Sequence, residues 1–264
     1  MMTGNAEAQK TKSKESERLN ASLINSLRIL DYLGQAEQPA TLAELRKTLD
    51  LNKSRVMRLC GTLEHMGYLK HENGLYALGP RLMSLGKVYE RQNPTREVIR
   101  TILRDLVDRL EETASFHVLR REKRLCMCAV ESPHPVRFIM LEGVEKTYPY
   151  GSIWKVIMTW GPAELREKIL FEAPFRSVTP NTVVTAEALK STIEQTRRDG
   201  YCYTNGDMDV GSAAIAAPVM DDAQHLLGVL CISGISERMD ARFLERTVPL
   251  LREKSKLVSA ILSA

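Results

Sequence analysis

The stretch from residue 41 to residue 78 constrains the fold of this chain more than any other, because capping and turn residues divide it into short, regular elements. Thr41 and Glu44 have the spacing of a capping box, in which each side chain pairs with a backbone N–H group at a helix start. Asp50 to Asn52 supply turn chemistry, and Asn52 is a favourable N-cap for the next helix. We therefore expect two short helices joined by a tight turn.

A hairpin is expected directly after the second helix. Asn73-Gly74 is the preferred pair for a two-residue type I′ turn, because both central residues need positive φ. The pair lies between residues 69–72 and 75–78, two short segments that suit paired strands. Two helices followed at once by a hairpin predict a winged helix-turn-helix.

The second helix has one apolar and one basic face. Residues at three- and four-residue steps are expected to point inward, namely Val56, Leu59, Cys60, Leu63 and Met66. Polar residues occupy the other face, namely Ser54, Arg55, Arg58 and Thr62, with Lys53 at the helix start. This pattern is typical of a helix that lies in a DNA major groove, although a solvated basic face would have the same spacing.

We assign DNA-binding roles to eight residues of this stretch. The first turns of the second helix would reach base edges through Lys53, Ser54, Arg55 and Arg58. Phosphates would be held by Thr41 and by the wing residues Lys70, His71 and Asn73. The expected partner is double-stranded operator DNA.

The distribution of charge agrees with a DNA-binding N-terminal part. Residues 1–91 hold 14 Lys and Arg against 10 Asp and Glu, whereas residues 92–264 hold 23 of each class. Since neutralisation of phosphates supplies most sequence-independent affinity for DNA, a basic first third and a neutral remainder suggest a DNA-binding part attached to a body with another task.

Composition excludes several other classes of protein. No run approaches the roughly eighteen consecutive apolar residues of a membrane span, and the N-terminus is polar where a signal peptide would be apolar. A cytoplasmic protein without membrane contact is therefore expected. The five cysteines are scattered and form no CxxC pair, which argues against a disulfide framework and a structural zinc site.

At 264 residues the chain suits two domains. We expect a polar, mobile tail, a DNA-binding domain, a linker helix and a second domain at residues 1–19, 20–80, 81–92 and 93–264. The DNA-binding domain would open with a helix whose apolar stripe packs across the helix-turn-helix pair through Leu23, Leu27, Leu30 and Leu33.

The second domain mixes strand-like and helical segments. After a long helix from residue 93, short β-rich segments are expected at residues 115–120, 124–131, 136–141, 200–204, 213–219 and 226–233. Helical patterns lie at 152–159, 163–171 and 187–198, and a final helix from residue 240 contains Pro249, which should kink or break it. The fold class is therefore α/β in the α+β sense, with a mainly antiparallel sheet and flanking helices.

Several segments together resemble IclR-type transcriptional regulators. The N-terminal part LAELRKTLDLNKSRVMRLCGTLEHMGYLKHENGLYALGPRLMSLG is similar to the DNA-binding domain of that family. The second domain is similar in LEETASFHVLRREKRLCMCAVESPHPVRF, in EALKSTIEQTRRDGYCY, and in GSAAIAAPV followed by LLGVLCISG. The resemblance implies a GAF-like effector-binding and oligomerisation domain, a homodimer or homotetramer, and effector-responsive repression or activation.

The resemblance also implies a small-molecule pocket. Its wall would include Gly151, Ser152, Asp209 and Ser233. The chain departs from the family pattern at Pro149, Trp154 and Ala214, and each of the three would alter the pocket wall. The identity of the effector therefore does not follow from the effector of a relative.

The chemistry of these residues suggests an acidic effector. Gly151-Ser152 would open a helix whose free N–H groups and positive dipole end suit an anion, so a small organic acid, possibly aromatic, is expected. Asp209 would accept from a hydroxyl or amine, and Ser233 would donate or accept. The alternative is that Ser152 only caps the helix and that the nearby aromatic residues only pack.

The sequence is less consistent with two other classes of function. Catalysis by His117, His134 or Asp207 is not favoured, because the sequence has no nucleophile elbow, phosphate-binding glycine loop or metal-ligand spacing. Cys126 and Cys128 would share one face of a strand and pack in the core. We thus expect no catalytic residue, metal or cofactor. An architectural DNA-binding protein without ligand control is the remaining alternative.

Overall fold

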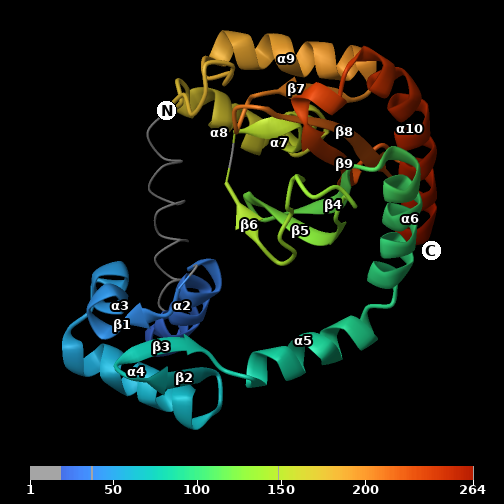
Figure 1. Cartoon of the computed structure of the whole chain (residues 1–264). Coiled ribbons are helices and arrows are strands. Elements are labelled where there is room, and N and C mark those ends of the chain that lie inside the picture. The colour runs from blue at the N-terminus through green and yellow to red at the C-terminus, as the bar shows by residue number, and fades with distance from the viewer. Residues whose placement is uncertain (1–18, 37, 148, 264) are drawn as a thin grey trace. The chain divides into compact units, whose positions relative to one another are not determined.

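The computed structural model describes residues 19–36, 38–147 and 149–263. Residues 1–18, which make up nearly all of the predicted tail, lie outside the described part. The chain divides into two compact units, one ending at Gln92 and the other beginning at Asn93 (Figure 1). Each unit is described by itself.

The first unit is a winged helix-turn-helix, as predicted. Its elements are α2 (Ala21–Gln35), β1 (Ala40–Thr41), α3 (Leu42–Leu49), α4 (Lys53–His65), β2 (Leu69–Glu72), β3 (Leu75–Leu78) and α5 (Arg81–Gln92). The three strands form a small antiparallel sheet in the order β1-β3-β2, in which β1 was not predicted. Figure 1 shows this unit in blue to teal.

Local chemistry sets the boundaries of these elements. Both halves of the capping box are present: the backbone N–H of Glu44 donates to Thr41 Oγ1 at 3.3 Å, and that of Thr41 donates to Glu44 Oε2 at 2.7 Å. Asn52 caps α4 by accepting from the backbone N–H of Arg55 at 2.9 Å. The hairpin turn has φ values of 52° at Asn73 and 78° at Gly74, so both central residues have the positive φ that a type I′ turn requires.

The predicted core of this unit was partly wrong. Leu23, Leu27 and Met66 were expected to point inward but are 59%, 50% and 59% exposed. On α2 the buried residues are Ile29 and Leu33, so the inward face is rotated from the predicted stripe. Met66 lies at the C-cap of α4, beyond the last helical residue, where the helical spacing no longer applies.

The second unit contains one antiparallel sheet and helices on both of its faces. In chain order, its first elements are α6 (Thr95–Leu110), β4 (Thr113–Arg120), β5 (Lys123–Val130), β6 (Glu145–Lys146), α7 (Gly151–Trp160), α8 (Ala163–Glu172) and α9 (Ala186–Asp199). They are followed by β7 (Cys202–Asn205), β8 (Ser212–Met220), β9 (Leu226–Ile235), a 3-10 turn (Ser236–Arg238) and α10 (Ala241–Ser263). The strand order is β6-β5-β4-β9-β8-β7.

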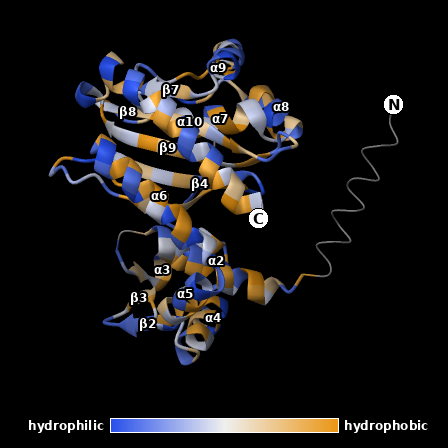
Figure 2. Cartoon of the chain, turned by 90° about the vertical axis from the view of Figure 1, so that its right-hand side faces the viewer, coloured by the Kyte–Doolittle hydropathy of each residue, from blue (hydrophilic) through white to orange (hydrophobic). Residues whose placement is uncertain are grey.

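The sheet separates two apolar layers. Residues of α6 and α10 pack with one face, where Phe116, Ile215 and Ile232 are buried. Residues of α7, α8 and α9 pack with the other face, where Ala216 and Cys231 are buried. Figure 2 shows polar and apolar bands alternating along α6, and β9 as hydrophobic over much of its length. The antiparallel sheet with flanking helices confirms the predicted fold class.

The strand predicted at residues 136–141 is absent from the structure, which has irregular backbone there. Its apolar residues 138–141 line cavities, and Ile139 and Leu141 also remain 54% and 64% exposed. The segment pairs with no strand among the described residues, so its β-rich composition reflects an irregular backbone beside the cavities and not a sheet strand. The short strand β6 follows it and was not predicted.

The final helix continues through Pro249, so of the two predicted effects, a kink or a break, the break does not occur. Proline removes one backbone hydrogen bond and leaves the carbonyl four residues earlier without its donor. Pro249 and Glu245, which carries that carbonyl, are both exposed, so water can hydrate the carbonyl.

Cys126 and Cys128 do not share a face of β5, contrary to the prediction. The register with β4 shifts between Phe116 and His117, so that Cys126 is opposite His117 and Cys128 is opposite Phe116. Met127 is the extra residue of this bulge. Cys128 thus packs with the α6 layer, whereas Cys126 lines a cavity on the other face.

Neither a membrane span nor a metal cluster occurs in the described part of the chain. No helix there is both long enough and apolar enough to cross a bilayer. No group of three or more His, Cys, Asp or Glu side chains gathers as metal ligands would among the same residues.

Candidate functional site

The first candidate site is the exposed N-terminal half of α4. Val56 and Cys60 are fully buried and anchor the helix in the core of the first unit. Lys53 and Arg58 are exposed on the opposite face, and Arg55 is half-buried. The helix therefore presents cationic side chains from a fixed backbone, which is the arrangement a recognition helix needs.

Some of the predicted DNA contacts are already engaged within the protein. The hydroxyl of Thr41 donates to Glu44 Oε2 at 2.7 Å, and that of Ser54 donates to Asn52 Oδ1 at 2.9 Å. These hydroxyls hold the starts of α3 and α4.

The wing residues are exposed but not all unconstrained. The Lys70 ammonium lies 2.7 Å from Glu72, and the His71 ring stacks on Tyr76 with 4.1 Å between ring centroids. Asn73 lies exposed in the turn itself. The exposed Lys70–Glu72 pair is weak, so a phosphate can compete for the lysine.

The second candidate site is a pair of adjoining cavities on the α7 side of the sheet. The first cavity, of about 40 Å³, is lined by Arg124, Phe138, Met140, Tyr150, Gly151, Ser152, Ile153, Thr204, Met208, Ser212, Ala213, Ala214, Cys231 and Ser233. The second, of about 110 Å³, shares Arg124, Phe138, Met140 and Met208 with it. Both cavities are smaller than the roughly 300–1,000 Å³ of pockets for drug-sized ligands, so a ligand of that size would require the walls to move apart.

The structure brings most of the predicted effector residues together. Gly151, Ser152, Ala214 and Ser233 line the first cavity. Asp209 is exposed and lines the second cavity.

Pro149 and Trp154 line neither cavity, contrary to the prediction. Trp154 is fully buried in the apolar layer formed by α7, α8 and α9. Residue 154 lies three residues into a helix whose first turn alone faces the cavity, so the indole points into the core instead of the pocket.

The start of α7 is held by a buried ion pair that the sequence did not reveal. Asp207 accepts from the Gly151 backbone N–H at 2.6 Å and from that of Val183 at 3.2 Å. Its carboxylate also lies 2.7 Å from the Lys155 ammonium, and both side chains of this pair are almost fully buried. The first N–H group of α7 is therefore occupied, and a ligand would have to use the following ones.

A row of buried polar side chains crosses strands β4 and β5 beside the first cavity. His117 Nε2 lies 2.9 Å from Ser115 Oγ, and Arg124 Nη1 lies 3.4 Å from His117 Nδ1. Burial, together with the nearby guanidinium of Arg124, holds the pKa of His117 well below its usual value of 6.5. Burial likewise lowers the pKa of Arg124. No sequence pattern pointed to Arg124, because the pairing of β4 with β5 decides its surroundings.

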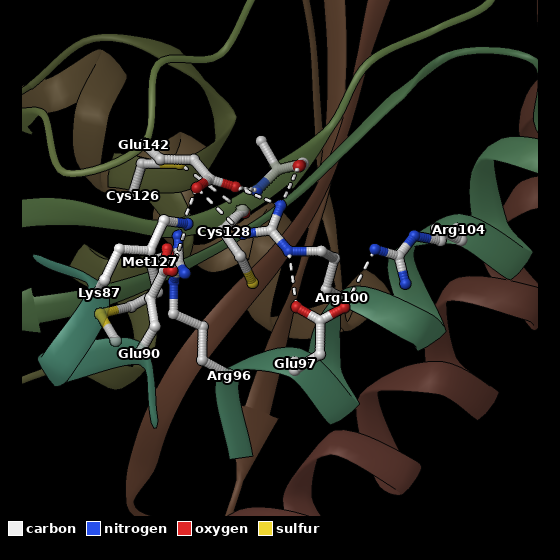
Figure 3. Close-up of polar contacts among 11 residues, drawn as sticks. Lys87, Glu90, Arg96, Glu97, Arg100, Arg104, Cys126, Met127, Cys128 and Glu142 are labelled. Atoms are coloured by element: carbon white, nitrogen blue, oxygen red, sulfur yellow. Dashed lines mark hydrogen bonds and ion pairs between the residues drawn. The ribbon is translucent and has the colours of Figure 1, made fainter. Parts of the chain in front are cut away.

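Residues 138–141 line the cavities and form the cavity cover. Glu142, which follows them directly, joins this cover to α6 (Figure 3). Arg100 donates to both carboxylate oxygens of Glu142, at 2.6 and 3.0 Å, and Arg96 pairs with the same carboxylate. The backbone N–H of Ala129 donates to Glu142 at 2.8 Å. Glu142 therefore joins the cover of the cavities to the first turns of α6.

A larger hollow of about 790 Å³ lies between the end of β8 and α10. It is an open groove, and Ser255 is its one buried polar side chain among the described residues. Small-molecule sites hold their ligands with enclosed, convergent polar groups. The two cavities beside α7 therefore remain the better candidate.

The chain matches two known families of protein domain. The family described as bacterial transcriptional regulator IclR C-terminal matches residues 88–260, and the IclR helix-turn-helix domain matches residues 22–73. The chain belongs to the IclR family. It is therefore a DNA-binding transcriptional regulator, and the family and its characterised relatives are regulators and not enzymes.

Among its relatives is the probable transcriptional regulator SauR of Cupriavidus necator, which is 26% identical over 90% of this chain and 95% of its own length. The transcriptional repressor IclR of Escherichia coli is 24% identical over 85% of this chain and 84% of its own.

Solved structures show the same fold. The IclR transcriptional regulator from Alicyclobacillus acidocaldarius superimposes with a TM-score of 0.84 at 23% identity, over 92% of this chain and 99% of that one. An IclR homologue from Microbacterium hydrocarbonoxydans complexed with 4-hydroxybenzoate has a TM-score of 0.79 at 21% identity, over the same shares of the two chains.

Proposed function

We propose that this IclR-family regulator binds a palindromic operator as a homodimer or homotetramer in the cytoplasm, and that a small organic acid controls the binding. The observation that carries the proposal is a helix with an exposed basic face in one unit combined with polar-lined cavities beside the start of α7 in the other. Whether the regulator represses or activates depends on the position of the operator relative to the promoter.

Base reading is assigned to Lys53, Ser54, Arg55 and Arg58. Arginine is the commonest bidentate partner of guanine in the major groove, and Arg58 is exposed one helical turn into α4. Lys70, His71 and Asn73 would lie along the phosphate backbone, and Thr41 would hold the start of α3 against it.

The acid is assigned to the first cavity. Its wall combines the hydroxyls of Ser152 and Ser233 with apolar surface from Phe138 and Met140. The backbone N–H groups that follow Gly151 at the start of α7 are donors for an anion. A relative of the same fold has been solved with 4-hydroxybenzoate, an aromatic acid of suitable chemistry, which supports the class of ligand.

The signal would travel from the cavity cover to α6 and from there along the chain to α5. Phe138 and Met140 line the cavities, and Glu142 on the same segment is held by Arg96 and Arg100 of α6. An acid that shifts this segment would change the first turns of α6, which follow α5 directly in the sequence. The linking stretch is thus residues 81–110.

The test of the DNA-binding role uses the full chain and an operator chosen by selection from random duplexes. Arg58→Ala should weaken operator binding by about 1–3 kcal/mol in a gel-shift titration and relax the preference at one base pair. Arg91→Ala on α5 removes the same charge outside the helix-turn-helix and should change affinity much less. Equal operator affinity of Arg58→Ala and the unaltered protein would remove Arg58 from the interface.

The test of ligand control adds metabolites to the same complex. A carboxylate that binds the second unit should change operator affinity, and the same compound should raise the melting temperature of the protein. At about 100 times its Kd it adds roughly 2.7 kcal/mol of stability. Release of the operator by another class of metabolite would disprove the acidic effector. If no metabolite changed operator affinity, an architectural DNA-binding protein would be favoured.

A further inference from the structure

Arg124 is a buried charge in the wall of both cavities. Its side chain comes from β5, and the residue is 5% exposed. Within the described residues its Nε has no hydrogen-bond partner, and no ion pair joins it to a carboxylate. A buried guanidinium without an anion is costly, because it has lost its hydration and gained no opposite charge.

His117 holds the guanidinium in place. Arginine has no acceptor, so Arg124 Nη1 donates to His117 Nδ1, across 3.4 Å. The proton of the neutral imidazole is then on Nε2, which donates to Ser115 Oγ at 2.9 Å. This row fixes one end of the guanidinium and leaves its Nε edge without a partner.

The remaining walls of the first cavity have no charge to satisfy Arg124. Of the residues that line this cavity, Arg124 alone is charged. The buried carboxylate of Asp207 is engaged by Lys155 at 2.7 Å and by two backbone N–H groups. The carboxylate of Asp209 is exposed and lines only the second cavity. What the cavity lacks is therefore a single negative charge.

We propose that Arg124 binds the carboxylate of the effector and that His117 is its positioning residue. This inference rests on the proposed function and deepens it, because it names the group that recognises the acid. One uncompensated cation selects a monocarboxylate over a dicarboxylate, and Phe138, Met140 and Ile153 provide apolar surface for the rest of a small molecule.

The experiment compares acids with their neutral amides on the full chain by calorimetric titration. The probes are 4-hydroxybenzoate with 4-hydroxybenzamide and pyruvate with pyruvamide. The unaltered protein should bind at least one acid tenfold or more tightly than its amide. Arg124→Gln should bind that acid roughly 10- to 100-fold more weakly and the amide within about threefold of the unaltered protein.

Matched variants separate recognition from folding. Arg120→Gln removes an exposed arginine from the neighbouring strand and should keep the acid-to-amide ratio. Arg124→Lys keeps the charge without the planar fork and should retain part of the ratio. His117→Leu should lower the ratio, whereas His117→Asn, which offers an acceptor near Nδ1, should restore much of it.

The melting temperature without ligand gives a second readout. Arg124→Gln should melt at the same temperature as the unaltered protein or higher, because an unpaired buried charge is gone. A lower melting temperature together with an unchanged acid-to-amide ratio would make Arg124 a structural residue and overturn the inference.

Two outcomes distinguish this inference from the proposed function. If the unaltered protein prefers the acid and Arg124→Gln prefers it equally, the effector is an acid but Arg124 does not bind it. If the unaltered protein binds no acid of the panel better than its amide, both the acidic effector and the role of Arg124 are disproved.

Discussion

Buried polar side chains distinguish the cavity face of the sheet at the scale of single residues. Ser115, His117 and Arg124 lie in a row across two strands, in a layer where most neighbours are apolar. Each such group costs free energy unless it is hydrogen-bonded, so a row of three is retained for something other than stability. The same row makes the stability of the second unit sensitive to pH.

We expect the unfolding free energy to fall as the pH drops below about 6.5, in part because of His117. Its folded-state pKa lies well below that value, since burial and Arg124 disfavour the imidazolium. Below pH 6.5 the imidazole of His117 binds a proton in the unfolded chain but stays neutral in the folded one. Between pH 7.5 and 5.5 this one residue removes about 1.4 kcal/mol of stability.

The measurement is urea unfolding at the two pH values. His117→Leu should show a difference between them that is smaller by about that amount. His134→Gln removes a partly exposed histidine of the same unit and serves as the control. An equal pH dependence of His117→Leu and the unaltered protein would show that the imidazole is protonated in the folded state.

At the scale of elements, α6 is both a core helix and an anchor for the cavity cover. Leu103 and Leu106 are fully buried against the sheet, which fixes the helix. Arg96 and Arg100 on its first turns hold Glu142, while Glu97 pairs with Arg100 and Arg104 along the helix surface (Figure 3). Burial alone would raise the pKa of Glu142, but its hydrogen bonds from Arg100 and Ala129 keep the pKa lowered.

Glu142→Gln should uncouple ligand binding from DNA release. The amide loses the charge that Arg96 and Arg100 share, so the cover is no longer fastened to α6. We expect the affinity for the acid to change by less than about threefold. The factor by which saturating acid changes operator affinity should become smaller by roughly tenfold or more. Such a loss corresponds to a coupling free energy of about 1–3 kcal/mol.

Glu97→Gln is the matched control for this prediction. It removes a carboxylate that pairs with Arg100 at 3.2 Å but does not reach the cavity cover. Calorimetric titration and gel shift on both variants would check the result. If the same acid concentration released operator DNA from Glu142→Gln as fully as from the unaltered protein, the signal would take another route.

At the scale of the whole molecule, the helices of the first unit carry apolar side chains that its own core does not use. On α2 Leu23 and Leu27 are 59% and 50% exposed, and on α5 Met83 and Leu85 are 70% and 43% exposed. Exposed apolar side chains that lie together are typical of surfaces that a protein partner covers. The homo-oligomer proposed above would cover some of these side chains.

A dimer should read two half-sites whose spacing follows the DNA helix. Two recognition helices related by a twofold axis are placed about 34 Å apart or a multiple of it, which is one turn of DNA. Inserting 5 base pairs between the half-sites should weaken binding tenfold or more, because one half-site then faces away. Inserting about 10 base pairs should restore part of the loss.

A gel shift with the three operators checks this prediction, and light scattering on the free protein gives the number of subunits. Equal affinity for the operators with 5 and 10 added base pairs would show that each copy of the chain binds DNA independently.

The amino-acid sequence by itself determined the local features of the first unit. Thr41, Asn52 and Asn73-Gly74 act within four residues of their own positions, so caps and turns follow from spacing alone. The antiparallel sheet with flanking helices could also be predicted from the sequence, because strands and helices differ in the spacing of their apolar residues along the chain. The first-cavity residues Gly151, Ser152, Ala214 and Ser233 came from the family resemblance.

Only the tertiary structure decided which side chains meet. The contact between Arg124 and His117 requires the pairing of β4 with β5, and the bulge at Met127 decides that Cys126 and Cys128 point to opposite faces. The partners Lys155 and Asp207 are more than fifty residues apart. Such contacts depend on strand register and helix docking, and these are set by packing over the whole second unit and not by the residues next to them in the sequence.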